Sequence, residues 1–267
     1  MTSYALRPIF FVKDYMVYYY RIALSIANIV RHKLRGLVKC PYRDQRMLLA
    51  DIGVVVVLDV GAHVGTTVAK YKKLFPEATI YGFEPFHDSY EKLRSRFSEC
   101  KLVKPIQAAI SNRSGTGQFH AYRNSATNSL LPADNQARQA SDRGRCWMEQ
   151  PSVIEELRTI DVPLITIDDF CERESIDRVD ILKMDIQGGE LMALEGAREK
   201  LRQAAISVIY CEMLFVPLYI GQASFDKVCN YLSSYDYRLF DMYNFTYTKS
   251  GRLEWCDAIF IGPMVGL

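Results

Sequence analysis

The chain has 267 residues, of which 49% are hydrophobic and 24% charged. A chain of this composition can bury a sizeable core and is not intrinsically disordered. Its length allows one large α/β domain with additions or two small domains. The net charge is only +2, which is too balanced for nucleic acid to be expected as the main partner.

Seven cysteines are scattered along the chain, and no two have Cys-x-x-Cys spacing. An odd number without that spacing argues against a disulfide framework and against a zinc knuckle. No secretory signal is evident at the start of the sequence. We therefore expect reduced thiols and a cytoplasmic location.

Residues 1–50 differ in character from the rest of the chain. Residues 1–46 hold nine Lys or Arg against two Asp, a net charge of +7, among many aromatic residues. No stretch reaches the roughly 20 apolar residues of a spanning helix. We expect a helical N-terminal extension over residues 1–50, with two interpretations open. It is a cap on the domain or on the second subunit of a homodimer, or it is a peripheral contact with the inner membrane surface through residues 1–46.

The most informative stretch begins with the apolar run Val54 to Leu58, which is typical of a strand in the middle of a parallel sheet. Residues 59–65 (DVGAHVG) predict a sharp glycine turn, and Thr66 to Phe75 predict a helix. Thr79 to Phe83 predict the next strand, which ends at Glu84. In open α/β sheets the ligand lies outside the carboxyl ends of the strands.

The spacing of the glycines bears on which nucleotide binds. The dinucleotide fingerprint requires glycine at the first, third and sixth turn positions. Counted from Gly61, the third position holds His63 and the sixth holds Thr66. The Gly-Lys-Ser/Thr of a phosphate-binding Walker loop does not follow the turn either. The turn therefore favours a nucleoside without phosphates, of which S-adenosylmethionine is the common one. Glu84 is placed to accept hydrogen bonds from its ribose. The alternative is a turn that serves only as a tight connection.

The middle of the chain predicts further α/β elements and one insertion. We expect a helix, a third strand and a strand that forms a hairpin with it, over residues 88–97, 102–110 and 115–122. Residues 124–163 are polar at first and predict an insertion that acts as a substrate loop or lid. Residues 164–170 are strand-like and lead into Asp168 and Asp169, where a turn or a helix is expected to start.

A second strand–turn–helix unit begins at Val179. An apolar strand ends at Asp185, a glycine turn follows, and the helix covers Leu191 to Leu201. Ala205 to Tyr210 predict another buried strand, with Glu212 just beyond it. The last expected elements are one helix and two strands, over residues 225–232, 237–240 and 258–261.

Four acids are thus expected at one edge of the sheet: Asp59, Glu84, Asp185 and Glu212. One such acid alone is explained by a solvated strand end or a helix N-cap. Crowded carboxylates raise one another's proton affinity, which is how general bases are tuned. They also suit a divalent cation, although nothing else in the sequence supports a metal. His63 contacts the substrate or is merely a turn residue.

These pieces resemble the FkbM family of S-adenosylmethionine-dependent methyltransferases. The resemblance spans residues 54 to 212, and its most specific part is residues 182–190 (LKMDIQGGE) with Glu195-Gly196-Ala197 downstream. The family often has Glu in place of Gln187 and another residue in place of Gly189. The other matching pieces are LDVGAHVG (58–65), GFEP (82–85), QAAIS (107–111) and LITIDDF (164–170).

The resemblance implies a class I methyltransferase domain over residues 51–267. That fold is a Rossmann-like, mostly parallel seven-stranded sheet with helices on both faces and an antiparallel edge hairpin. It also implies S-adenosylmethionine as cofactor and S-adenosylhomocysteine as product. The residues expected to bind the cofactor are Asp59, Gly61, Ala62, His63, Gly65, Glu84, Pro85, Gln107, Ala108, Ala109 and Asp185.

The implied reaction is O-methylation of a hydroxyl, on a sugar of a glycan or glycolipid precursor or on a polyketide. Asp185 is the first choice for the proton acceptor, followed by Glu212 and His63. The residues expected to bind the acceptor are Gln187, Glu190, Asn128 and Trp147. Two other classes stay open: a non-catalytic scaffolding subunit with this fold and a dinucleotide-dependent oxidoreductase.

Overall fold

The computed structural model of the chain describes residues 39–51, 53–137, 155–248 and 250–266. The chain divides into a unit of residues 1–40 and a unit of residues 41–267. The predicted N-terminal helix lies almost wholly outside the described residues.

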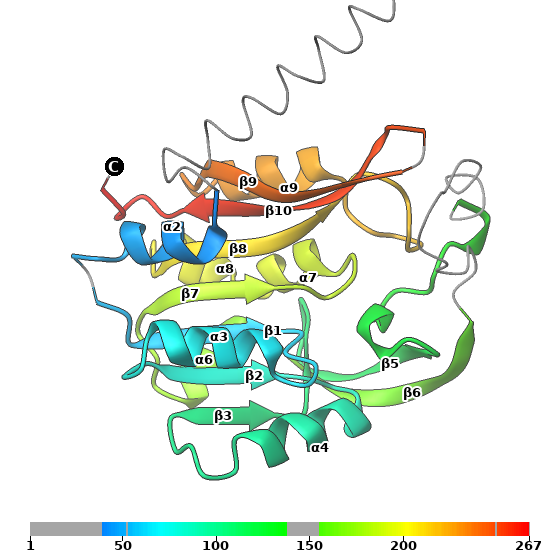
Figure 1. Cartoon of the computed structure of the whole chain (residues 1–267), viewed down its shortest axis with the longest axis horizontal. Helices are drawn as coiled ribbons and strands as arrows, with labels where there is room; N and C mark the ends of the chain where they lie inside the picture. Colours follow the sequence, from blue (N-terminus) through cyan, green and yellow to red (C-terminus); the bar gives the residue numbers. More distant parts are fainter. Residues whose placement is uncertain (1–38, 52, 138–154, 249, 267) are drawn as a thin grey trace, which may run out of the picture. The chain divides into compact units, whose positions relative to one another are not determined.

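A seven-stranded sheet forms the centre of the domain, in the order β3-β2-β1-β7-β8-β10-β9 (Figure 1). Its first five strands pair in parallel, whereas β10 pairs antiparallel with β8 and with β9. This is the predicted class I methyltransferase sheet with an antiparallel edge hairpin. The strands are β1 (Val56–Val60), β2 (Thr79–Phe83), β3 (Val103–Ile106), β7 (Val179–Met184), β8 (Ile206–Leu214), β9 (Arg238–Tyr247) and β10 (Leu253–Ile261).

Helices cover both faces of this sheet because the central strands are apolar on both faces. In β1, Val57 belongs to one hydrophobic cluster and Leu58 to the other. The first face is covered by α2 (Pro41–Leu48), α3 (Thr66–Leu74) and α4 (His87–Arg96). The second is covered by α6 (Ile167–Arg173), α7 (Glu190–Glu195), α8 (Arg198–Arg202) and α9 (Phe225–Ser233).

Helix α2 belongs to the methyltransferase domain, which moves the domain boundary from residue 50 to residue 40. Leu48 and Leu49 are buried in the cluster on the first face. Gln45 accepts a hydrogen bond from the Tyr71 hydroxyl at 2.9 Å, and Asp44 accepts one from the Tyr243 hydroxyl at 2.9 Å. These buried polar contacts tie α2 to α3 and to β9.

A second sheet has three strands: β4 (Ala109–Ile110), β6 (Glu156–Ile165) and β5 (Gly115–Tyr122). The observed elements in this region correct four predictions. The expected third strand breaks after Ile106, and β5 pairs with β6 rather than with the strand before it. Residues 156–163 of the expected insertion form most of β6. The expected strand over 164–170 ends at Ile165, because Thr166 caps α6 by accepting a hydrogen bond from the Asp169 amide.

The C-terminal half also differs in its boundaries. The helix expected over 191–201 is split into α7 and α8 near Gly196, where the backbone passes close to Ser111: a Cβ would lie 2.1 Å from the Ser111 carbonyl oxygen. Glu212 lies inside β8, paired with Asp257, rather than beyond the strand. The last two strands are longer than the apolar runs that predicted them.

The turn after β1 packs directly on the loop after β7. Gly61 has φ of +79°, and a Cβ there would lie 2.0 Å from the Asp185 carbonyl oxygen. Only glycine permits both the backbone conformation and this close approach. The contact brings the two glycine turns of the sequence together.

We expect Gly61→Ala to destabilise the protein by about 2–5 kcal/mol, since it adds left-handed backbone strain to an overpacked contact. The matched control is Gly53→Ala. Gly53 has φ of +72° but no atom within 4 Å of an added Cβ, so only the backbone cost of about 1–2 kcal/mol remains. Urea unfolding of both variants measures the difference. Equal losses would contradict the close approach.

Candidate active site

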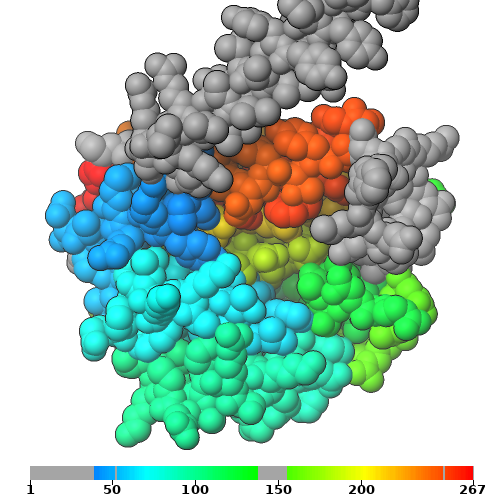
Figure 2. Space-filling model, viewed as in Figure 1, coloured from blue at the N-terminus to red at the C-terminus, as the bar shows by residue number. Residues whose placement is uncertain are grey.

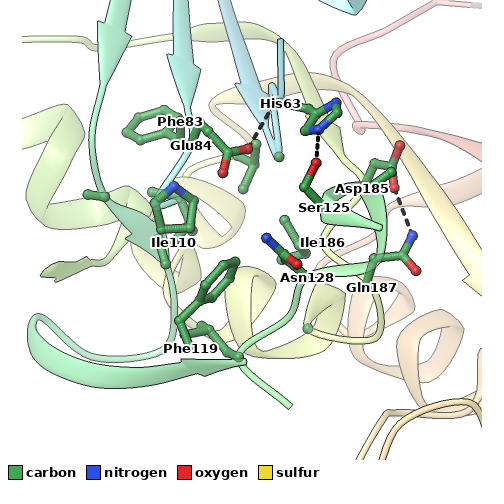
Figure 3. Close-up of a pocket in the computed structure, with 18 of the residues that line it drawn as sticks. His63, Phe83, Glu84, Ile110, Phe119, Ser125, Asn128, Asp185, Ile186 and Gln187 are labelled. Atoms are coloured by element: carbon green, nitrogen blue, oxygen red, sulfur yellow. Dashed lines mark hydrogen bonds between the residues drawn. The ribbon is translucent and has the colours of Figure 1, made fainter. Parts of the chain in front are cut away.

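A cavity of about 210 Å³ lies at the carboxyl ends of β1, β2 and β7 (Figure 3). The main sheet contributes Gly61, Glu84 and Asp185 to its lining, and the second sheet contributes Ile110 and Phe119. The cavity therefore lies at the edge that the sequence predicted, with the second sheet as an additional wall. Further lining residues are His63, Thr66, Thr67, Pro85, Ala108, Ala109, Ser125, Asn128, Leu130, Lys183, Ile186, Gln187 and Gly189.

Glu84 ends β2 with its carboxylate at the cavity. One carboxylate oxygen accepts a hydrogen bond from the His63 amide and the other from the Phe86 amide, both at 2.9 Å. Burial raises the pKa of Glu84 to about 7, while the two amides oppose that rise. The side chain is fixed by its backbone partners and remains able to accept further hydrogen bonds from a ligand.

The glycine turn contributes fewer residues to the lining of the cavity than the sequence predicted. His63 lines the cavity, has φ of +49°, and its Nε2 lies 2.8 Å from the Ser125 hydroxyl. Burial lowers the pKa of His63. Ala62 packs in the apolar core instead, and a Cβ on Gly65 would meet Phe97 and Leu93 of the α4 region. Ala62 and Gly65 shape the turn but do not line the cavity.

The second sheet closes the apolar end of the cavity. Ile110, Phe119 and Leu130 form its surface there. Asn128 accepts a hydrogen bond from the Tyr122 amide at 2.8 Å, and its buried Nδ2 has no partner among the described residues. An apolar slot with one unpaired amide donor suits the edge of a nucleobase.

Phe119, Ser125 and Leu130 were not predicted as site residues. Their positions depend on the pairing of β5 with β6, across 36 residues between His120 and Glu156, whose side chains meet at 2.9 Å. The one signal in the sequence was the Asn128-Ser129-Leu130 stretch in the polar segment. Of the predicted cofactor residues 107–109, Ala108 and Ala109 line the cavity, whereas the exposed side chain of Gln107 lies near His87.

A buried ion pair lies beneath the cavity. The Lys183 ammonium is 3.0 Å from the Asp59 carboxylate, 3.7 Å from the Asp185 carboxylate and 3.2 Å from the Gly61 carbonyl oxygen, to which it donates. Burial disfavours the charge on Lys183, but Asp59 and Asp185 outweigh it and raise its pKa. Asp59 does not line the cavity. It orients Lys183 and, through it, the turn at Gly61.

Gln187 joins two of the predicted catalytic acids. Its amide nitrogen donates to Asp185 at 3.2 Å and to Glu212 at 2.8 Å, and its amide oxygen accepts from the Tyr219 hydroxyl at 2.8 Å. Burial, together with the neighbouring Asp185 carboxylate, raises the pKa of Glu212 well above its ordinary value. The protonated form of Glu212 is thereby favoured, whereas Asp185 faces the Lys183 cation.

The predicted acceptor-binding residues fall into different places. Gln187 and Asn128 line the cavity, but Glu190 does not. Glu190 is buried and accepts a hydrogen bond from the Ile186 amide at 3.1 Å, so it stabilises the turn after β7. Trp147 lies outside the described residues. Within residues 39–51, 53–137, 155–248 and 250–266, no group of three His, Cys, Asp or Glu side chains is arranged to hold a metal ion.

The residues present fit S-adenosylmethionine. Glu84 can accept from two ribose hydroxyls, the slot at Phe119 and Leu130 can take the adenine, and the unpaired Asn128 amide can donate to its ring. The strand order and the acid after β2 define a class I methyltransferase that uses S-adenosylmethionine.

Comparison with known proteins gives the family. The model of the Methyltransferase FkbM domain matches residues 59–239, and the chain belongs to this family. It is 24% identical over 181 residues to the 2-O-methyltransferase NoeI of Sinorhizobium fredii (strain NBRC 101917 / NGR234), covering 68% of this chain and 72% of NoeI. It is 27% identical over 157 residues to the methyltransferase sdnD of Sordaria araneosa, covering 54% of this chain and 61% of sdnD.

Two solved structures are more remote. An rRNA methylase from Streptococcus thermophilus has a TM-score of 0.45 and 10% identity, covering 84% of this chain and 98% of that one. Fibrillarin of Aeropyrum pernix, with natively bound S-adenosyl-L-methionine, has a TM-score of 0.42 and 13% identity, covering 86% of this chain and 74% of that one.

We expect the affinity for S-adenosylhomocysteine to fall about tenfold from pH 8 to pH 6. The ionised form of Glu84 is the one that accepts hydrogen bonds from both ribose hydroxyls, and the pKa of Glu84 in the free protein is about 7. Binding at pH 6 therefore releases close to one proton. Burial also lowers the pKa of His63, which disfavours a positive charge on that residue. Calorimetry in two buffers of different ionisation enthalpy measures both quantities.

The control for this experiment is Glu84→Gln, which keeps the shape of the side chain and removes its titration. It should lose about 1–3 kcal/mol of binding free energy at pH 8, and the loss should shrink at pH 6. Any pH dependence that remains belongs to the ligand or to other groups. Unchanged affinity in the variant would mean that Glu84 does not hold the ribose.

Proposed function

We propose that the protein transfers a methyl group from S-adenosylmethionine to a sugar hydroxyl of a glycan or glycolipid precursor. The observation that carries the proposal is the position of Asp185. Asp185 lines the cavity described above and also a second cavity of about 290 Å³. Thr67 and Lys183 likewise line both cavities. An acceptor in the second cavity would meet a cofactor in the first beside this carboxylate.

The chemistry asks for two things from the protein. Bound S-adenosylmethionine supplies an electrophilic methyl group. The chain must hold the acceptor oxygen in line with that group and remove the hydroxyl proton. Asp185 suits the second task, since it lines both cavities and its carboxylate lies 3.7 Å from the Lys183 ammonium and 3.2 Å from the Gln187 amide nitrogen. Glu212 is less suited, because its burial favours the protonated form, which cannot accept the proton.

Two considerations support a sugar as the acceptor. NoeI, one of the relatives, is a 2-O-methyltransferase by name. The second cavity is also lined by groups that hydrogen-bond hydroxyls, including Asp185, Glu212, Asn244 and Asp257. A hydroxyl of a polyketide or another small molecule is the alternative acceptor. The complete cavity around Glu84 and Asp185 disfavours a non-catalytic scaffolding subunit.

The setting of the reaction is part of the proposal. No helix within the described ranges is long and apolar enough to cross a bilayer. We propose that the basic segment before α2 rests on an anionic cytoplasmic surface, where each basic residue adds about 1 kcal/mol. Asp44 and Gln45 anchor α2 in the domain. The truncated variant for liposome flotation should therefore lack residues 1–39 and keep α2. Full flotation of that truncation would favour a homodimer contact for the segment instead.

We expect Asp185→Asn to slow methyl transfer by about 100-fold or more, the usual effect of losing a general base, and to keep its affinity for S-adenosylhomocysteine. Glu212→Gln is the matched comparison. Because burial favours the protonated form of Glu212, the amide should reduce the rate by less than about tenfold. Transfer of a labelled methyl group into a glycan extract measures both. If Asp185→Asn keeps the parental rate while Glu212→Gln is inactive, the two roles are exchanged.

Deletion of the gene should remove one methyl ether from the cell's glycans, and mass spectrometry of those glycans identifies it. Restoring the parental gene should return the methyl group, and restoring Asp185→Asn should not. Glycans with every methyl group intact, together with the loss of a methyl group from a lipid or polyketide, would overturn the sugar assignment.

A further inference from the structure

The second cavity is built from elements that the cofactor cavity does not use. It lies on the face of the sheet covered by α2 and α3, at the ends of β7, β8 and the β9–β10 hairpin. In Figure 2 this face is hollowed between cyan residues after β1 and orange residues of the hairpin, with yellow-green residues in the floor. The lining residues outside the first cavity are Tyr42, Lys70, Met184, Tyr210, Cys211, Glu212, Asn244, Trp255 and Asp257.

Asp257 is held in place at this cavity by two neighbours. Its Oδ2 accepts a hydrogen bond from the Tyr210 hydroxyl at 2.7 Å and another from the side-chain Nδ2 of Asn244 at 2.6 Å. Both bonds go to the same oxygen, so Oδ1 has no hydrogen-bond partner among the described residues. Two donors thus fix the Asp257 carboxylate through Oδ2, and Oδ1 is preorganised to accept a hydrogen bond from a ligand hydroxyl.

The backbone is distorted to make this arrangement. Between Trp255 and Asp257, the partner strand β9 advances from Thr246 to Tyr243, which is one residue more than a regular ladder. The extra residue lies in a bulge, and Asn244 there has φ of +53°. Bulges of this kind re-aim a side chain, often beside a functional site. Here the strained residue is the one whose amide orients Asp257.

Trp255 adds an aromatic surface to the same lining. Residues 255 and 257 lie on the same face of β10, opposite Leu214 and Glu212 of β8. An indole ring beside a carboxylate and an amide suits a sugar, whose ring has an apolar C–H face and an edge of hydroxyls. An apolar acceptor would instead leave Oδ1 of Asp257 without a hydrogen-bond donor.

We propose that the second cavity is the acceptor site, that Trp255 packs against the sugar ring, and that Asp257 binds a hydroxyl next to the one that is methylated. This inference rests on the proposed function, in which Asp185 faces the reacting hydroxyl. It replaces Trp147 by Trp255 as the tryptophan that contacts the sugar. It also makes Asp257, held by Tyr210 and Asn244, the residue that selects acceptors with neighbouring hydroxyls.

The first test measures binding without turnover. The chain has two tryptophans, so Trp147→Phe leaves Trp255 as the sole indole. Protein saturated with S-adenosylhomocysteine is titrated with methyl glycosides of common hexoses and deoxyhexoses. We expect a saturable change in Trp255 emission that is absent with cyclohexanol. If no glycoside changes the emission, or cyclohexanol does so equally, the acceptor site is placed wrongly.

The second test uses Asp257→Asn with Asp241→Asn as the matched control. Asp241 lies in the same hairpin but lines neither cavity. We expect Asp257→Asn to raise the glycoside dissociation constant and KM about 10- to 100-fold, as for a lost charge-assisted hydrogen bond. Its S-adenosylhomocysteine affinity, its melting temperature and kcat should change little. Asp241→Asn should match the parent. An unchanged KM in Asp257→Asn would overturn the role of Asp257.

The two tests separate this inference from the proposed function. If glycosides change Trp255 emission and Asp257→Asn weakens that binding, while no hydroxyl is methylated, the cavity binds sugars and the proposed reaction is wrong. If the parent methylates glycosides and Asp257→Asn leaves both binding and KM unchanged, the reaction stands and the acceptor lies elsewhere.

Discussion

The structure depends on a buried cation at the carboxyl end of the central strands. Lys183 lies between Asp59 of β1 and Asp185 after β7, and it also donates to the Gly61 carbonyl. A buried ammonium without these acceptors would be very costly. These three acceptors belong to β1, to the turn after β1 and to the loop after β7. By binding all three, Lys183 fixes how the two glycine turns meet. Both cavities include Lys183 in their linings, so one interaction sets the geometry on both sides of Asp185.

The four acids expected at one edge have distinct physical roles because their partners differ. Asp59 is fully buried beside a lysine, and Glu84 is held by two backbone amides. Asp185 is about half exposed and lies near a cation and an amide. Glu212 lies within β8, and burial among other acids raises its pKa. Asp59 is thus an ion-pair partner, whereas the proposed roles of Glu84 and Asp185 are ribose acceptor and base, and strand periodicity alone could not distinguish these positions.

The local parts of the fold were predictable from the sequence, and the long-range parts were not. Continuous apolar runs and glycine turns located β1, β2 and β7 together with Glu84 and Asp185. The second sheet was missed because β4 has two residues and β6 lies far along the chain from β5. Phe119 and Leu130 of the cofactor cavity were missed with it. Asn244 and Asp257 were missed because their approach depends on a bulge in β9, which has no reliable signature in a single sequence.

The match to the family model ends at residue 239, whereas Asn244, Trp255 and Asp257 all follow it. The cofactor cavity draws on the matched region, and the β9–β10 hairpin stands at the sheet edge with only β8 as its neighbour in the main sheet. In the proposed acceptor site, Asn244, Trp255 and Asp257 thus follow the matched region, whereas Lys183, Asp185 and Glu212 of the same cavity lie within it. A hairpin at the edge of a sheet can change without rebuilding the central strands, so the proposed site predicts that relatives with different acceptors differ most in this hairpin.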